Sequence, residues 1–552
     1  MFRTVSWLIG LTVMVLIGLF FLNSPAYLPP DGVEYLTGAR FISRGLGYGM
    51  YGYFPHQILP QVNSPPFLSF AISVVMRFSG WNEVMAFKAV NLLSLIVYFC
   101  AYGYLVRTLF NSKFLYFFAL FFIVNAPVIW RYVNLVMTEV LFTGILSLLF
   151  VMCLNAMECE RKKMRWILFF LGGGLATILS LTRFAGIYVT AGCLLAFWLS
   201  GKSVGFKSKM MESICFIAPV VVGWGGWLLR NSRMQTSLYY LSSLHRQPVL
   251  EHVWPLQARF LNTVAGVLIQ GFPLSDLSDG RARILMAASA FVFFALLIWL
   301  ALEKKKNLAL DSKRLSFLLL AGAFVTIYIL ANNLTWMIRG FGITARYFYV
   351  LFPVFFIAAL LILDDVRGEK GISLRKKVFS KPALLIGLML WSHLCHAWEG
   401  QKYFTAVMKE MNGPMSFDQK IFDPVFGRSP WVLRLLREKV AENDLLMSNE
   451  RLYLAYLTDR PCAPVSFLES ETKKMTNLIA ADRGFADAIS HRIFVVWRKA
   501  TPGLSVRRDE LKTYVSHFEY HLLQQDEHVM VLELRPKFAP SDEAVFFPKI
   551  EP

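Results

Sequence analysis

Charged side chains are scarce in this sequence. Aspartate, glutamate, lysine and arginine make up 17% of its 552 residues, whereas 56% are hydrophobic. A soluble globular protein carries roughly a quarter charged residues. The shortage is confined to residues 1–400, which hold long apolar runs, while residues 400–552 have the composition of a soluble domain. This distribution excludes a chain of several soluble domains and predicts one membrane domain followed by one small soluble domain.

Cysteine is sparse as well, with seven residues in the whole chain. Cys462 is the only one beyond residue 400, so the soluble domain has no internal disulfide bond. No two cysteines have the spacing of a metal site. Thiol chemistry is therefore not expected to be the function.

Acidic residues are outnumbered, because 37 Asp and Glu face 56 Lys and Arg and give a net charge of +19. Nucleic-acid binding would need a basic patch on a soluble element. The lysines instead cluster between apolar segments, which is typical of the positive-inside bias of membrane proteins. We therefore expect membrane lipids, and no nucleic acid, among the partners.

Apolar runs long enough to cross a bilayer are abundant. The first, Trp7–Leu22, follows Arg3 and lacks a strong cleavage site, so we expect an uncleaved first helix with a cytoplasmic N-terminus. Further spans are expected at 86–106, 114–130, 139–157, 166–182, 185–200, 213–229, 284–302, 315–334, 346–363 and 382–399. The apolar stretch Pro65–Gly80 is too short to span comfortably and is expected to lie in the interface or against the bundle.

Basic clusters set the predicted orientation. They lie in connections around residues 161–165, 202–209, 304–314 and 367–381. With the spans above, all of them fall on the same side as Arg3, which is then the cytoplasm. The extracytoplasmic side receives the long loops 23–85 and 230–283 and the soluble domain 400–552, and residues 1–399 form the transmembrane domain. The predicted fold class is a polytopic α-helical membrane protein with about eleven transmembrane helices and a C-terminal extracytoplasmic α/β domain.

The soluble domain mixes helical and strand patterns. Trp431–Glu442 and Arg451–Leu457 are predicted helices. Strands are predicted at 444–448, 493–497 and 528–534. This mixture indicates an α/β domain, and no catalytic motif stands out in it.

Basic residues expected on the extracytoplasmic side are almost all arginine. Guanidinium binds phosphate in a bidentate fork and tolerates partial burial better than ammonium. Candidates near the ends of hydrophobic segments are Arg183, Arg230, Arg339 and Arg346. Two interpretations stay open: these arginines bind a phosphorylated lipid, or they pair with headgroups and local carboxylates.

The first candidate catalytic group follows the first span. If a helix begins near Asp31, that residue is its N-cap and Glu34, three residues later, completes a capping box. The functional interpretation places the Asp31 carboxylate at the membrane surface, where it takes a proton from an incoming hydroxyl or amine. The two interpretations are compatible.

A second carboxylate, Glu139, lies where an apolar run begins. An acid in that position is costly unless it is paired or functional. Arg131 or another extracytoplasmic arginine is its expected partner. Glu139 is interpreted either as a site residue or as a helix cap.

Several segments follow one another in a recognisable order. Asp31 is followed by Tyr35-Leu36, Ala39-Arg40 and Gly45-Leu46-Gly47-Tyr48, then by Pro65-Pro66, Glu139, Arg346-Tyr347 and Pro353. In this order and spacing, roughly residues 1–400 resemble the GT-C superfamily of membrane glycosyltransferases. The pattern is nearest to bacterial enzymes grouped with protein O-mannosyltransferases and lipid A aminoarabinose transferases.

The resemblance implies a glycosyltransferase, a hexosyl- or pentosyltransferase, of the bacterial inner membrane. It would move a sugar from a polyprenyl-phosphate donor to an extracytoplasmic glycan, lipid or protein acceptor. Asp31 would act as the general base, with Glu139 and Glu34 as further catalytic candidates. The remaining candidates would bind the substrates. The donor phosphate would be bound by Arg183, Arg230, Arg339 and Arg346. The acceptor or the donor would be bound by Tyr35, Arg40 and Tyr347.

The sequence also departs from the pattern. The first loop has no Asp-x-Asp motif, and Gly32 follows Asp31. No cofactor is therefore predicted, and a divalent metal stays open without a motif to support it. The alternative function is a transporter or flippase of a lipid-linked saccharide. It would need ionisable or broken segments near mid-membrane, whereas most charges here lie at the expected helix ends.

Overall fold

The structure is a computed structural model that places part of the chain. It describes residues 26–52, 56, 58–62, 64–124, 132–200, 205–234, 312–339, 349–351, 353–354, 356–358, 360–361, 421–422, 429, 431–464, 492–498, 518–526 and 529–536. The spans predicted at 7–22, 284–302 and 382–399 lie outside these residues. The chain divides into two compact units, a first of Met1–Leu22, Val62–Leu68 and Phe87–Met408, and a second of Asn23–Gln61, Ser69–Ala86 and Lys409–Pro552. The predicted division at residue 399 stays a prediction.

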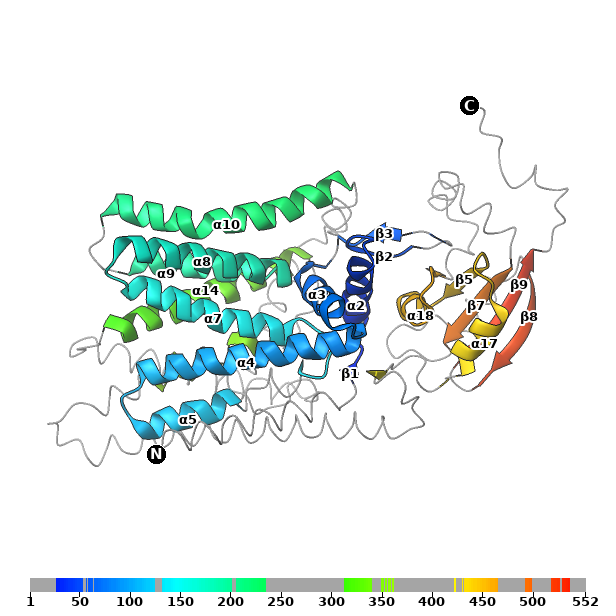
Figure 1. Cartoon of the computed structure of the whole chain (residues 1–552), viewed down its shortest axis with the longest axis horizontal. Coiled ribbons are helices and arrows are strands. Elements are labelled where there is room, and N and C mark those ends of the chain that lie inside the picture. Colours follow the sequence, from blue (N-terminus) through cyan, green and yellow to red (C-terminus); the bar gives the residue numbers. More distant parts are fainter. Residues whose placement is uncertain are drawn as a thin grey trace. The chain divides into compact units, whose positions relative to one another are not determined.

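The first unit is built from apolar helices that run along one direction (Figure 1). They are α4 (Glu83–Leu109), α5 (Lys113–Val124), α7 (Glu139–Glu158), α8 (Lys162–Thr182), α9 (Gly186–Leu199), α10 (Phe206–Arg233) and α14 (Ser312–Arg339), with a short 3-10 turn, η2, at Tyr349–Leu351. Each predicted span from 86–106 to 213–229, and that at 315–334, overlaps one of these helices. Among the described residues, α4, α7, α8 and α10 are long and apolar enough to cross a membrane. The protein is therefore membrane-embedded and mostly helical.

Two glycines let these helices approach closely. A Cβ on Gly173 of α8 would lie 2.2 Å from the backbone oxygen of Phe216 in α10. A Cβ on Gly144 of α7 would lie 2.6 Å from the backbone oxygen of Ser94 in α4. Small residues of this kind allow helix backbones to pack directly against each other in membranes. Within the run Gly172-Gly173-Gly174, Gly173 thus serves helix packing.

The second unit joins the loop after the first predicted span to the end of the chain. From the loop come β1 (Ala26–Tyr27), α2 (Pro30–Ser43), the hairpin of β2 (Gly49–Tyr51) and β3 (Ile58–Pro60), and most of α3 (Phe67–Ser79). α3 is the short helix predicted at 65–80, and it ends before Gly80. β1 pairs in parallel with β4 (Ile421–Phe422), so the two distant parts of the chain share backbone hydrogen bonds.

The end of the chain forms an α/β domain. Its helices are α17 (Trp431–Lys439) and α18 (Arg451–Thr458). Its sheet has the order β6-β5-β7-β9-β8, made of β5 (Leu445–Ser448), β6 (Ala463–Pro464), β7 (Ile493–Arg498), β8 (Phe518–Gln525) and β9 (Val529–Pro536). β5 is buried along its whole length and apolar except for Ser448, and it pairs in parallel on both sides, as central parallel strands do. The predicted helices and strands of this domain are confirmed within a few residues.

Candidate functional site

Helix α2 carries Asp31 in its first turn, but Asp31 is not the cap. The N-cap is Pro29, and Pro30 is the first helical residue. Proline suits that position because it has no N–H to leave unsatisfied and its φ is already helical. The prediction that Asp31 caps the helix was therefore wrong, and the N-cap lies two residues earlier. Asp31 is half-buried, and its charge lies at the positive end of the helix dipole.

Glu34 also does not form the predicted capping box. Its Oε2 accepts a hydrogen bond of 2.7 Å from Nε2 of Gln61, which is buried beside it. Tyr35, a predicted binding residue, is buried, and its backbone oxygen accepts a hydrogen bond of 2.9 Å from Ser69 of α3. These contacts fix α2 against neighbouring segments of the second unit.

In the first unit, Glu139 and Arg183 form a buried ion pair. Arg183 Nη1 donates to Glu139 Oε1 across 2.5 Å, and the Glu139 side chain is fully buried. The expected arginine partner is thus found, and it is Arg183. Thr138 holds the N-cap position of α7, so the interpretation of Glu139 as a helix cap was wrong. Glu139 Oε2 has no hydrogen-bond partner among the described residues, which leaves one buried carboxylate oxygen available to a ligand.

The chain places Arg183 through a tight turn. Arg183 is the C-cap of α8, and its N–H donates to the Leu179 carbonyl over 2.9 Å. Three residues later the Gly186 N–H donates to the Arg183 carbonyl over 2.9 Å. A Cβ on Gly186 would come within 2.4 Å of the Leu179 backbone. The extended backbone of Arg183 between two helices directs its side chain to α7, where it meets Glu139.

The other predicted phosphate-binding arginines are less fully described. Arg230 lies in the last turn of α10, where Nη1 donates to Asn231 Oδ1 over 2.9 Å. Asn231 in turn donates to the Val62 carbonyl over 3.4 Å. The side chains of Arg339, Arg346 and Tyr347 lie outside the described residues.

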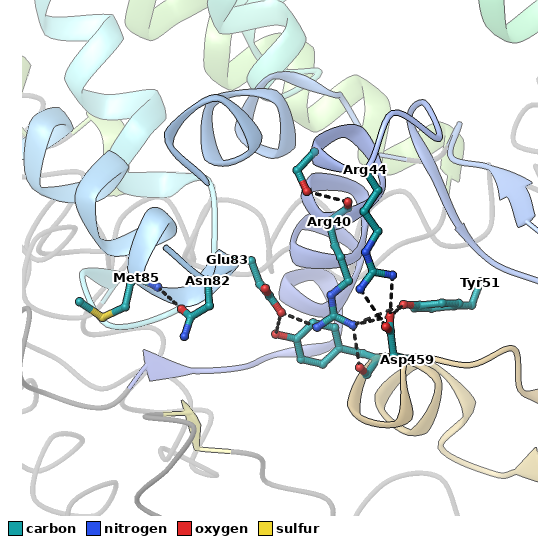
Figure 2. Close-up of polar contacts among 9 residues, drawn as sticks. Arg40, Arg44, Tyr51, Asn82, Glu83, Met85 and Asp459 are labelled. Atoms are coloured by element: carbon teal, nitrogen blue, oxygen red, sulfur yellow. Dashed lines mark hydrogen bonds and ion pairs between the residues drawn. The ribbon is translucent and has the colours of Figure 1, made fainter. Parts of the chain in front are cut away.

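The densest polar cluster of the second unit is centred on Arg40 of α2 (Figure 2). Arg40 forms an ion pair with Glu83, the first residue of α4. It forms a second ion pair, of 3.0 Å, with Asp459, which follows α18. It also donates to the Tyr456 carbonyl over 3.1 Å and lies 4.6 Å from the centre of the Tyr456 ring. The Arg40 guanidinium, predicted to bind acceptor or donor, is thus held by several groups of the protein itself.

Asp459 is the second centre of this cluster. It accepts two hydrogen bonds from Arg44, at 3.1 and 2.8 Å, and one from the Tyr51 hydroxyl. Its backbone is left-handed, with φ 58°, at the C-cap of α18. Aspartate adopts this conformation more readily than most residues. The turn brings the Asp459 carboxylate to Arg40 and Arg44.

Burial and neighbouring groups set the protonation states of Asp459 and Tyr51. Burial raises the pKa of Asp459, but the hydrogen bonds of Arg44 and Tyr51 and the charges of both arginines outweigh it and hold that pKa below its usual value. Burial, followed by the hydrogen bond to Asp459, raises the pKa of Tyr51 to about 12. At neutral pH, Asp459 is therefore ionised and Tyr51 keeps its proton.

Three of the arginines that the sequence predicts on the extracytoplasmic side have carboxylate partners, and their binding of a phosphate stays a prediction. Arg40, Arg44 and Arg183 all pair with local carboxylates. Among the described residues there is no group of three or more His, Cys, Asp or Glu side chains that could hold a metal ion. Metal dependence was open in the sequence and stays open.

Comparison with known proteins was made at the level of sequence and of structure. No protein-family profile and no curated protein sequence matches the chain. A crystal structure of ArnT from Cupriavidus metallidurans bound to undecaprenyl phosphate does match, with a TM-score of 0.57 over 96% of this chain and 98% of ArnT. The identity is 11%. The chain has the ArnT fold.

Two other solved structures also match. ArnT in the apo state matches with the same score and coverage. Archaeal oligosaccharyltransferase AglB from Archaeoglobus fulgidus, in complex with an inhibitory peptide and a dolichol-phosphate, covers 94% of this chain with a TM-score of 0.47 and 12% identity. The similarity in fold to ArnT covers 96% of this chain and so includes the C-terminal domain.

Sequence reasoning did not find Glu83, Tyr51, Tyr456 and Asp459 as members of a cluster. Arg40 and Asp459 are 419 residues apart, and no local pattern joins them. Only one sequence feature pointed to this place. Asp459 stands in the segment Thr458-Asp459-Arg460-Pro461, where a polar residue before a proline is typical of a helix end.

Proposed function

We propose that the protein is an integral-membrane glycosyltransferase that moves a sugar from a polyprenyl-phosphate donor to an extracytoplasmic glycan, lipid or protein acceptor. The observation that carries the proposal is the ArnT fold over nearly the whole of both chains, since that ArnT structure holds undecaprenyl phosphate. The buried Glu139–Arg183 pair adds the chemistry expected of a site for an anionic donor.

The reaction is a single inverting displacement. A hydroxyl or amine of the acceptor attacks the anomeric carbon of the sugar and gives its proton to the Asp31 carboxylate. The bond between that carbon and the phosphate oxygen breaks, and polyprenyl phosphate leaves with the bonding electrons. A phosphate leaving group needs little acid assistance, so the site needs positive charge more than a proton donor.

The donor phosphate is proposed to bind Arg183, Arg230, Arg339 and Arg346. Glu139 holds the Arg183 guanidinium in place through Oε1. Its unpartnered Oε2 is proposed to accept a hydrogen bond from a donor hydroxyl, because a buried carboxylate oxygen without a donor is costly. Tyr35, Tyr347 and Glu34 complete the proposed site as binding and catalytic candidates.

The proposed topology has about eleven spans, a cytoplasmic N-terminus and a periplasmic C-terminal domain in the inner membrane. It places α2 and the loop 230–283 on the side where a lipid-linked sugar is presented to extracytoplasmic acceptors.

A transporter of a lipid-linked saccharide is the competing function. Transporters of this kind bind substrate at interrupted helices near the midplane. In the described part of the first unit, α4, α7, α8 and α10 each run without interruption, and α10 does so across Pro219. Continuous helices favour the enzyme.

The test uses the purified full-length chain in proteoliposomes with a polyprenyl-phosphate-linked sugar. The enzyme releases polyprenyl phosphate and transfers the sugar to a soluble acceptor, so both products accumulate together. Movement of the intact lipid-linked sugar between leaflets, without release of polyprenyl phosphate, would establish the transporter instead.

A further inference from the structure

Helix α18 of the C-terminal domain contacts α2 and the segment before it at opposite ends. The Tyr453 hydroxyl donates to the Leu28 carbonyl over 3.2 Å, two residues before α2 begins. At the other end, Asp459 and the Tyr456 carbonyl bind Arg40, and Asp459 also binds Arg44. These contacts hold both the start and the last turn of a helix only 14 residues long.

Backbone hydrogen bonds of neighbouring segments add to these contacts. The backbone N–H of Cys462 donates to the Gly52 carbonyl over 3.3 Å, just after β2. β1 pairs with β4 immediately before α2. Tyr453 and Tyr456 are both buried, so their contacts are shielded from water. Since helix α2 is rigid, fixing its two ends fixes the position and rotation of every residue on it, including Asp31.

We propose that the C-terminal domain, through α18, positions α2 and thereby sets the place of Asp31. Arg40 and Asp459 are positioning residues in this scheme, because they act on the reaction only through α2. The inference rests on the proposed function for its catalytic part. It assigns to the C-terminal domain a task that needs no catalytic motif within that domain.

The contacts also explain why the cluster is ionic. Arg40 of α2 and Arg44, the C-cap of α2, meet the single carboxylate of Asp459. Glu83 pairs with Arg40 as well. Charge-assisted hydrogen bonds are shorter and stronger than neutral ones, and a pair of them to one carboxylate, as Arg44 makes to Asp459, adds geometric specificity. A rotation of α2 would break several of them together, so the helix has one preferred orientation.

The experiment compares D459N, Y453F and their double variant with R492Q in the full-length protein. Arg492 is a matched control because its ion pair with Asp444 lies in the same domain and does not involve α2. The exposed fraction of its side chain, 46%, is also similar to the 44% of Asp459. Three quantities are measured: hydrogen–deuterium exchange of residues 30–43, transfer kinetics with undecaprenyl-phosphate-linked sugar, and binding of undecaprenyl phosphate.

We expect the double variant to exchange the α2 amides faster and to lose kcat by about tenfold or more, because small displacements of a reacting group are costly. Binding of undecaprenyl phosphate should stay unchanged, R492Q should match the wild type, and D459E should recover part of kcat. A general loss of folding would instead lower binding and kcat together.

Three results would overturn the inference: unchanged exchange in α2, faster exchange with normal kcat, or the same loss in R492Q. If the double variant does not fold, Y453F alone removes one hydroxyl and decides the same questions. A wild-type protein without transferase activity would remove the proposed function and the catalytic part of the inference, and the exchange measurement would still decide whether α18 holds α2.

Discussion

Arg183 and Glu139 join the end of α8 to the first residue of α7 through a hydrogen-bonded ion pair of 2.5 Å. Glu139 is fully buried and Arg183 nearly so, which makes each charge dependent on the other. Removing one partner of such a pair leaves an uncompensated buried charge, whereas replacing both with apolar residues is often tolerated.

Stability and activity should therefore respond differently to changes in this pair. We expect E139A to lower the free energy of unfolding by about 3–5 kcal/mol, and the double variant E139L/R183M to recover most of that loss. Transfer should be abolished in both. Unfolding in detergent and the transfer assay measure the two effects. An active double variant would exclude the pair from the site.

Asp31→Asn tests the proposed base. Asparagine is nearly isosteric, and loss of the helix-dipole interaction in the first turn should cost less than about 1 kcal/mol. Loss of a general base should lower kcat about a hundredfold to ten-thousandfold, since an amide cannot take the proton. Binding of undecaprenyl phosphate should survive. Near-normal transfer would move the assignment to Glu34 or Glu139.

Gly173→Ala should separate α8 from α10. The new methyl would meet the Phe216 backbone at 2.2 Å, which neither helix can accommodate without moving. We expect a loss of about 1–3 kcal/mol in stability, as for overpacked cores. Gly174→Ala is the control, because a Cβ there has no atom within 4 Å. Equal melting temperatures for the two variants would contradict the packing role.

The Asp459 cluster should weaken in acid. Because the pKa of Asp459 is lower in the folded protein than in the unfolded chain, the folded state binds fewer protons. The stabilisation that ionised Asp459 gives the folded protein is complete above the pKa of an aspartate in the unfolded chain, roughly 3.9. It is lost as pH falls through the lower pKa of Asp459 in the folded protein. Exchange of the α2 amides, corrected for intrinsic rates, should be constant at neutral pH and rise in that acidic window. D459N should show no such rise, and a rise of equal size in D459N would refute the assignment.

The topology has its own test. Reporter fusions after residues 163, 209, 305 and 376 should report the cytoplasm. Fusions after residues 50, 250 and 450 should report the opposite side. A cytoplasmic signal at residue 450 would mean that a span has been miscounted and that Asp31 and the C-terminal domain do not face lipid-linked donors.

Much of the architecture follows from sequence because it depends on local patterns. An apolar run of about 20 residues must satisfy its backbone within itself in a bilayer, so it forms a helix whatever its neighbours are. The helices α7, α8 and α10 were predicted for this reason, and the buried strand β5 was predicted from its short apolar run. Local patterns can also mislead. The spacing of Asp31 and Glu34 suggested a capping box, but the N-cap is Pro29, two residues before Asp31.

The sequence by itself determined the membrane class, the positions of the apolar helices, the α/β nature of the last domain and the acids and arginines available to a site. Only the tertiary structure decided which of them meet. Arg183 could have paired with several acids, and it pairs with Glu139 because the turn at Gly186 directs it to α7. Arg40 meets Asp459 across 419 residues because α18 packs along α2. Contacts of this range depend on how whole helices pack, and no periodicity along the chain encodes that.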